Sequence, residues 1–110
     1  MNFTGDEERG PILLAGARRE LQTIAALHKS LVGPQSAKRI TDKILNHLEL
    51  LNTFPNLGRP LPDAELQAKE YRMLVTENYI SIYRVIDDMV YVYHIVDGRT
   101  NYPNLFALLD

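Results

Sequence analysis

The sequence predicts an α+β domain in which an antiparallel two-helix hairpin packs on one face of a small, mainly antiparallel β-sheet. Apolar residues recur every three or four positions through much of the first half of the chain, which is the period of an amphipathic helix. In the second half the period changes to two, which is typical of strands. The 110 residues are enough for a single domain.

The first predicted helix begins near Ala17 and ends before Gly33-Pro34. Its apolar stripe consists of Ala17, Leu21, Ile24, Ala25, His28 and Leu31. Pro34 is expected to open the second helix, because proline is well tolerated in a first turn. The apolar face of that helix consists of Ala37, Ile40, Ile44, Leu48 and Leu51. It ends at Phe54-Pro55, since a residue before proline is pushed out of the α region.

The segments around this hairpin have less regular patterns. Residues 1–10 are polar and without periodicity, which predicts a flexible N-terminal tail and leaves residues 11–110 as the single domain. The short apolar run at 12–15 fits either a buried strand or the start of a helix. Residues 55–69 contain three prolines and a glycine, so they are expected to form a connector with at most one turn of helix.

Three runs rich in Tyr, Val and Ile, at 71–76, 79–86 and 89–96, predict an antiparallel meander. The residue pairs between them, Glu77-Asn78 and Asp87-Asp88, are the expected two-residue turns.

These turn lengths set a register. Arg72 would lie beside Tyr83, and Ser81 would lie beside His94. One face of the meander would then be mostly apolar, and we expect it to pack on the helices. The other would gather Arg72, Ser81, Tyr83 and His94 on a surface that the helices leave open. A slip of one residue would exchange the two faces.

Composition excludes several classes of protein. The chain has no cysteine, and its three histidines have no ligand spacing, so neither a metal nor another cofactor is expected. The apolar runs are too short to cross a bilayer and no signal-peptide core is visible, which predicts a soluble cytoplasmic protein. Residues 70–110 carry three basic and six acidic side chains, whereas a protein that grips nucleic acid usually shows a basic excess.

A few side chains could carry chemistry. Arg72 could clamp a phosphate with its paired donors, or form a surface ion pair. His94 could act as a general acid or base, or be held by a hydrogen bond to a neighbour such as Ser81. Arg99 and Tyr102 follow the last strand, where loops often present functional groups. Tyr83 and the other sheet tyrosines are strand formers that could also stack on bases.

Four phrases occur in order along the chain: residues 53–60 (TFPNLGRP), 71–74 (YRML), 78–85 (NYISIYRV) and 92–102 (VYHIVDGRTNY). Through these phrases the chain resembles toxins of the RelE/ParE superfamily, the plasmid stabilisation family of type II toxin–antitoxin systems. The resemblance spans residues 12–106 and implies the same order of strand, helix hairpin and meander. It also implies a cognate antitoxin as partner and a toxin–antitoxin hetero-oligomer.

The resemblance implies one of two activities. RelE-like members cut messenger RNA on the ribosome without a metal, and Arg72, Arg99 and Tyr102 match their catalytic pattern, with His94 or Tyr102 moving a proton. In that case Tyr83 and Ser81 would help to bind the substrate. ParE-like members instead poison DNA gyrase as binding proteins. The lysine cluster of many RelE members is missing here, and Thr100 stands where a second arginine is often found. The leading expectation is the ribonuclease, with a gyrase poison or a module that only binds its antitoxin as alternatives.

Overall fold

The computed structural model describes residues 10–107, so nearly all of the expected N-terminal tail lies outside the described residues. The elements in chain order are β1 (Ile12–Leu13), α2 (Ala15–Leu31), α3 (Pro34–Glu49), the 3-10 turn η1 (Leu50–Asn52), β2 (Arg59–Pro60), α4 (Ala64–Ala68), β3 (Arg72–Thr76), β4 (Tyr79–Ile86), β5 (Met89–Asp97) and α5 (Pro103–Ala107). The sheet has five strands in the order β1-β5-β4-β3-β2. Only the β1–β5 pair is parallel. The predicted fold class is confirmed.

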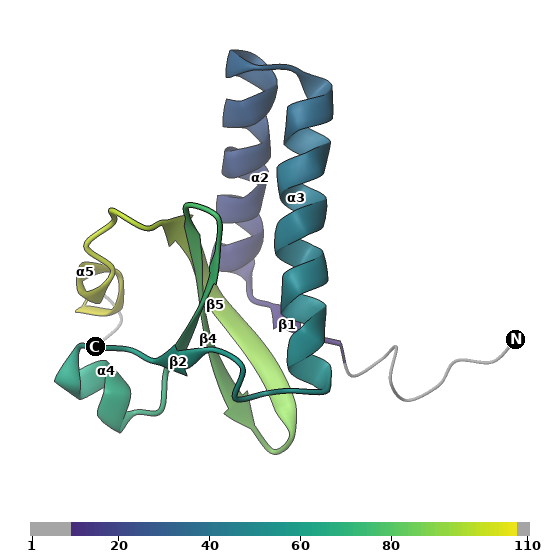
Figure 1. Cartoon of the computed structure of the whole chain (residues 1–110). Helices are drawn as coiled ribbons and strands as arrows, with labels where there is room; N and C mark the ends of the chain where they lie inside the picture. Colours follow the sequence, from purple (N-terminus) through teal and green to yellow (C-terminus); the bar gives the residue numbers. More distant parts are fainter. Residues whose placement is uncertain (1–9, 108–110) are drawn as a thin grey trace, which may run out of the picture.

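The two long helices form an antiparallel hairpin that stands on one face of the sheet, while the short helices α4 and α5 lie on the other side (Figure 1). We call these the inner and the outer face. Gly33 joins α2 to α3 with φ of 142°, a backbone conformation that side chains with a Cβ rarely adopt. Its neighbour Pro34 occupies the first turn of α3, as the sequence predicted.

Each face of the sheet has its own apolar cluster. The inner cluster joins the helix hairpin to the sheet through Ala17, Leu21, Ile24, Ile40, Ile44, Leu48, Leu51, Leu74, Tyr79, Tyr83, Val90, Val92 and Ile95. The outer cluster is smaller and consists of Leu61, Leu66, Tyr71, Met73, Ile80, Ile82 and Phe106. Burial on both sides explains why no strand of the meander has a simple apolar and polar alternation.

The prediction of which face the helices cover is wrong. The predicted pairing of β3 with β4 is confirmed, since Arg72 lies opposite Tyr83 and Leu74 opposite Ser81. The helices, however, pack on the face of Leu74, Ser81 and Tyr83, which was expected to be open. The error arose because α4 and α5 cover part of the outer face, so its apolar residues needed no long helix above them.

A β-bulge changes the pairing of β4 with β5. Tyr83 lies opposite Val92, but the next partner pair is Ile82 with His94, so Tyr93 is an extra residue. Beyond the bulge, Ser81 lies opposite Ile95, which corrects the predicted pairing of Ser81 with His94. A bulge of this kind re-aims the side chains that follow it.

Candidate functional site

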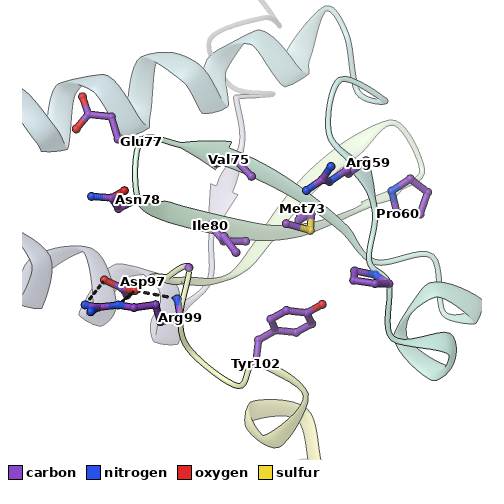
Figure 2. A pocket seen from close by; sticks show the side chains of 12 residues that line it. Arg59, Pro60, Met73, Val75, Glu77, Asn78, Ile80, Asp97, Arg99 and Tyr102 are labelled. Atoms are coloured by element: carbon purple, nitrogen blue, oxygen red, sulfur yellow. Dashed lines mark hydrogen bonds and ion pairs between the residues drawn. The ribbon is translucent and has the colours of Figure 1, made fainter.

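A cleft of about 1010 Å³ opens on the outer face of the sheet. Its floor is apolar and is made by Met73, Val75 and Ile80 (Figure 2). Arg59 from β2 lies at one side, and the other side is made by Asp97 at the end of β5 and by Gly98, Arg99 and Tyr102, which follow it. The arrangement suits a ligand that has both apolar and anionic groups.

Arg99 lies at the rim of this cleft and is paired with Asp97. Its Nε lies 3.0 Å from Oδ1 of Asp97, its Nη2 lies 3.3 Å from Oδ2, and its backbone N–H donates to Oδ1 at 2.9 Å. These hydrogen bonds hold the pKa of Asp97 below its ordinary value. The arginine side chain is 92% exposed, so solvent and ligands can reach it. Its charge is nonetheless already partnered.

Tyr102 lines the same cleft through its ring and hydroxyl. Burial raises the pKa of this tyrosine, and Asp63 raises it further, while Arg59 acts in the opposite direction. A phenol with a raised pKa keeps its proton at neutral pH. Tyr102 can therefore donate a hydrogen bond to a ligand, but it is poorly suited to act as a base.

Glu77 lines the cleft from the β3–β4 turn and faces α3. Its Oε2 lies 2.8 Å from Nη1 of Arg39 and 2.9 Å from Nζ of Lys43. The hydrogen bond from Arg39, followed by that from Lys43, lowers the pKa of Glu77 to about 2. This cluster fixes the turn to the helix hairpin.

Arg72 pairs with Tyr83 of the inner face, and its side chain binds the connector. Its Nε donates to the carbonyl of Gly58 at 3.0 Å, and its Nη2 donates to the carbonyl of Asn56 at 3.3 Å. Tyr83 holds the same connector, because its hydroxyl accepts from the N–H of Gly58 at 3.0 Å and donates to the carbonyl of Pro55 at 2.7 Å. We call this set of contacts the connector lock.

Gly58 is required at this position by space. A Cβ there would lie 2.5 Å from the carbonyl oxygen of Met73 and 2.8 Å from the ring of Tyr83. The phrase at residues 53–60 therefore has a structural explanation: the glycine lets the connector approach the sheet closely enough for Arg72 and Tyr83 to bind it.

Ser81 and Tyr83, the residues expected to bind substrate, are buried beneath the helix hairpin. Ser81 is 1% exposed and Tyr83 is 0% exposed. Neither side chain reaches the surface in this structure.

His94 lies at the β5 edge of the sheet, next to α2. Its Nδ1 is 3.2 Å from Oε1 and 3.0 Å from Oε2 of Glu20, and its ring stands edge-on to Phe106 at 5.1 Å between centroids. The Oε1 atom of Glu20 also accepts from the backbone N–H of Ile95 at 3.0 Å. The carboxylate of Glu20 is thus a hydrogen-bond partner for both the ring of His94 and the backbone N–H of Ile95 in β5.

The four expected catalytic side chains are divided among three places. Arg99 and Tyr102 line one cleft, Arg72 belongs to the connector lock, and His94 is bound to Glu20. Across residues 10–107, no hydrogen bond or ion pair joins any of the four to another.

Sequence reasoning missed two residues of interest. Glu20 and His94 are 74 positions apart, and no local pattern could have paired them. Arg59 was seen only as part of the connector phrase, although the connector brings it to the cleft beside Met73.

Within the described residues, no group of three or more His, Cys, Asp or Glu side chains could hold a metal ion. None of the helices described there is long and apolar enough to cross a membrane.

Comparison with known proteins gives a family. No curated protein matches the sequence. A solved chain titled "Chromosomal ParDE TA system from P. aeruginosa" has the same fold, with a TM-score of 0.68 and 20% sequence identity; the match covers 80% of this chain and 94% of that chain. A family model described as the ParE toxin of type II toxin–antitoxin system, parDE, matches residues 12–102. Because that match covers most of the sequence, this chain belongs to the ParE toxin family of type II toxin–antitoxin systems.

Proposed function

We propose that this chain is a cytoplasmic toxin, held silent in a hetero-oligomer with its antitoxin, that acts by binding DNA gyrase rather than by cutting messenger RNA. The observation that carries the proposal is that Arg72 and Arg99 are used in different places: Arg72 is hydrogen-bonded to the connector, whereas Arg99 is paired with Asp97 at the rim of the cleft. Family membership supports the toxin and the antitoxin. Gyrase is the target that the resemblance to ParE-like members implies.

The chemistry of RNA cleavage explains why the separation matters. Metal-free cleavage of a phosphodiester needs positive charge where the transition state builds negative charge, and it needs a proton donor or acceptor within hydrogen-bond reach. Arg72 gives its donors to backbone carbonyls, and His94 gives Nδ1 to Glu20. A protein that acts by binding does not need these side chains to meet at one place.

Two assays in parallel test the proposal. The purified chain is mixed with gyrase, ATP and supercoiled plasmid, and separately with ribosomes translating a defined message. We expect trapped, cleaved plasmid in the first assay and intact message in the second. Addition of the antitoxin should abolish the plasmid cleavage. Cleaved message together with intact plasmid would overturn the choice of target.

A ribonuclease is the second candidate, because Arg59, Arg99 and Tyr102 line one cleft. If the second assay yields cleaved message, Arg99→Ala should lower that rate by about 10²–10³, the usual effect of removing one charge-stabilising donor. Arg18→Ala is the matched control, since Arg18 is an exposed residue of α2. Activity in neither assay, with the antitoxin still bound, would support the third reading of a module that only binds its antitoxin.

A further inference from the structure

Arg84 differs from Arg99 because no carboxylate partners it, and from Arg72 because its guanidinium is not bound by backbone carbonyls. Arg72 is bound by backbone carbonyls and Arg99 by Asp97. Arg84 makes a long hydrogen bond, 3.5 Å from Nη1 to the hydroxyl of Tyr71. Within residues 10–107 no ion pair involves Arg84. Most of its donors are therefore available to a ligand.

Aromatic rings hold the Arg84 guanidinium in place. Its central carbon lies 5.0 Å from the ring centroid of Tyr71 and 5.9 Å from that of Tyr93, both within cation–π range. The two rings also contact each other edge-on, at 5.1 Å. A guanidinium that is already positioned loses less conformational entropy when it binds a planar anion with paired hydrogen bonds.

The surroundings of Arg84 have the composition of a protein interface. On the outer face it lies opposite Tyr91, and Ile86 lies opposite Met89 at the end of the same strands. Tyr91, Tyr93 and Met89 are half-buried, and Ile86 is 36% exposed. We call Tyr71, Arg84, Ile86, Met89, Tyr91 and Tyr93 the Arg84 platform. Aromatic residues, methionine and arginine are the types enriched at the centres of interfaces.

There is also room beside the platform. A hollow of about 720 Å³ lies between the end of α4 and β4, lined in part by Tyr71, Arg84 and Ile86. Lys69 and Glu70 line the same hollow, and two further carboxylates, Asp87 and Asp88, form the turn that follows Ile86. These carboxylates would repel the dense negative charge of a nucleic-acid backbone. They leave space for a single carboxylate carried by an otherwise apolar protein segment.

We propose that the Arg84 platform is the binding site for a segment of the antitoxin. This segment presents a carboxylate to Arg84 and apolar side chains to the tyrosines. The inference rests on the antitoxin half of the proposed function and is independent of the choice of gyrase. The resting state of such a toxin is its complex, so a half-exposed apolar surface around an unpaired cation is one that the antitoxin would cover.

Binding of the purified antitoxin, the product of the adjacent gene, tests the inference. We expect Arg84→Gln to weaken binding by about 30-fold or more, because the partner's carboxylate would be left unpaired in a desolvated contact. Arg84→Lys, which keeps the charge but loses the paired donors, should show a smaller loss. Arg18→Gln, the same charge change on the exposed surface of α2, is the matched control and should bind like the wild type.

Further readouts make each outcome decisive. Thermal unfolding of Arg84→Gln shows whether the fold survives; if it does not, Tyr91→Ala replaces it, again with an expected loss of about 30-fold. Binding of either folded variant within about threefold of Arg18→Gln overturns the inference. Normal antitoxin binding with loss of growth arrest would also overturn it, by assigning the platform to the target. If the wild type and Arg18→Gln also fail to bind the antitoxin, both this inference and the antitoxin half of the proposed function are wrong.

Discussion

The two faces of the sheet use arginine and tyrosine in opposite ways. On the inner face, Arg72 and Tyr83 give their hydrogen bonds to the backbone of the connector, and Tyr83 is completely buried. On the outer face, Arg99 and Tyr102 line a cleft, and Arg99 is almost fully exposed. The same residue types, in phrases that match the same family, thus serve the fold on one side and remain available to ligands on the other. Catalytic roles assigned to such phrases by resemblance must be checked against where each donor is already used.

The largest effect should come from the core of the inner face. Leu48 is 1% exposed under the helix hairpin, and Leu48→Ala should cost about 2–5 kcal/mol of unfolding free energy because it leaves a cavity. Val75→Ala is the outer-face control, since Val75 is 45% exposed in the cleft, and it should change stability by no more than about 0.5 kcal/mol. Urea unfolding measures both. Equal losses of unfolding free energy in the two variants would show that the two faces do not differ in this respect.

The connector lock should show the next largest effect. Tyr83→Phe removes the hydroxyl that binds Gly58 and Pro55, and it leaves the Gly58 N–H without its partner. We expect a loss of about 1–3 kcal/mol in urea unfolding. Tyr102→Phe removes a hydroxyl from the outer cleft and should leave stability nearly unchanged. A neutral Tyr83→Phe would mean that water replaces the hydroxyl and that the lock contributes little.

The two arginines provide a direct comparison across the sheet. Arg72→Ala should destabilise the fold by about 1–3 kcal/mol, because a charged donor to two carbonyls is lost. Arg99→Ala should leave the melting temperature unchanged, since its pair with Asp97 is exposed to solvent. Calorimetry of both variants measures their melting temperatures and shows whether only Arg72→Ala destabilises the fold. If Arg72→Ala melts like the wild type but loses growth arrest, Arg72 acts on the target and not on the connector.

The smallest effect should be the pH dependence supplied by Glu77. Its pKa is lowered in the folded state to about 2 from an ordinary value of 4.5, so its ion pairs stabilise the fold above pH 4.5 and are lost as the pH falls toward 2. The difference in melting temperature between wild type and Glu77→Gln should therefore shrink over that range. A difference that is constant with pH would show that Arg39 and Lys43 contribute through packing alone.

Most of the elements could be predicted from the sequence, because their signals are local. The strand run predicted at 79–86 has the same bounds as β4, and Pro34 does open the second helix. Asp87 and Asp88 both have positive φ, as a two-residue hairpin turn requires.

The candidate site could not be assembled in the same way, because it depends on contacts between distant segments. Apolar residues occupy both faces of the meander, so alternation alone could not tell which face the helices would cover. No local sequence pattern marks the extra residue at Tyr93, and this residue moves His94 away from Ser81. The role of Arg72 depends on a connector that approaches only because residue 58 is a glycine.

The pairing of β1 with β5 has a consequence for how the chain folds. Ile12 and Leu13 lie opposite Tyr91 and Val92, so an edge of the sheet joins the two ends of the described chain. During synthesis this edge cannot form until the last strand has left the ribosome, and non-local pairing of this kind is slow to form. A chain truncated before β5 would lack the strand that both β1 and α2 pack against. Incomplete products of translation should therefore remain unfolded and open to proteolysis, and only the finished chain would present both faces of the sheet.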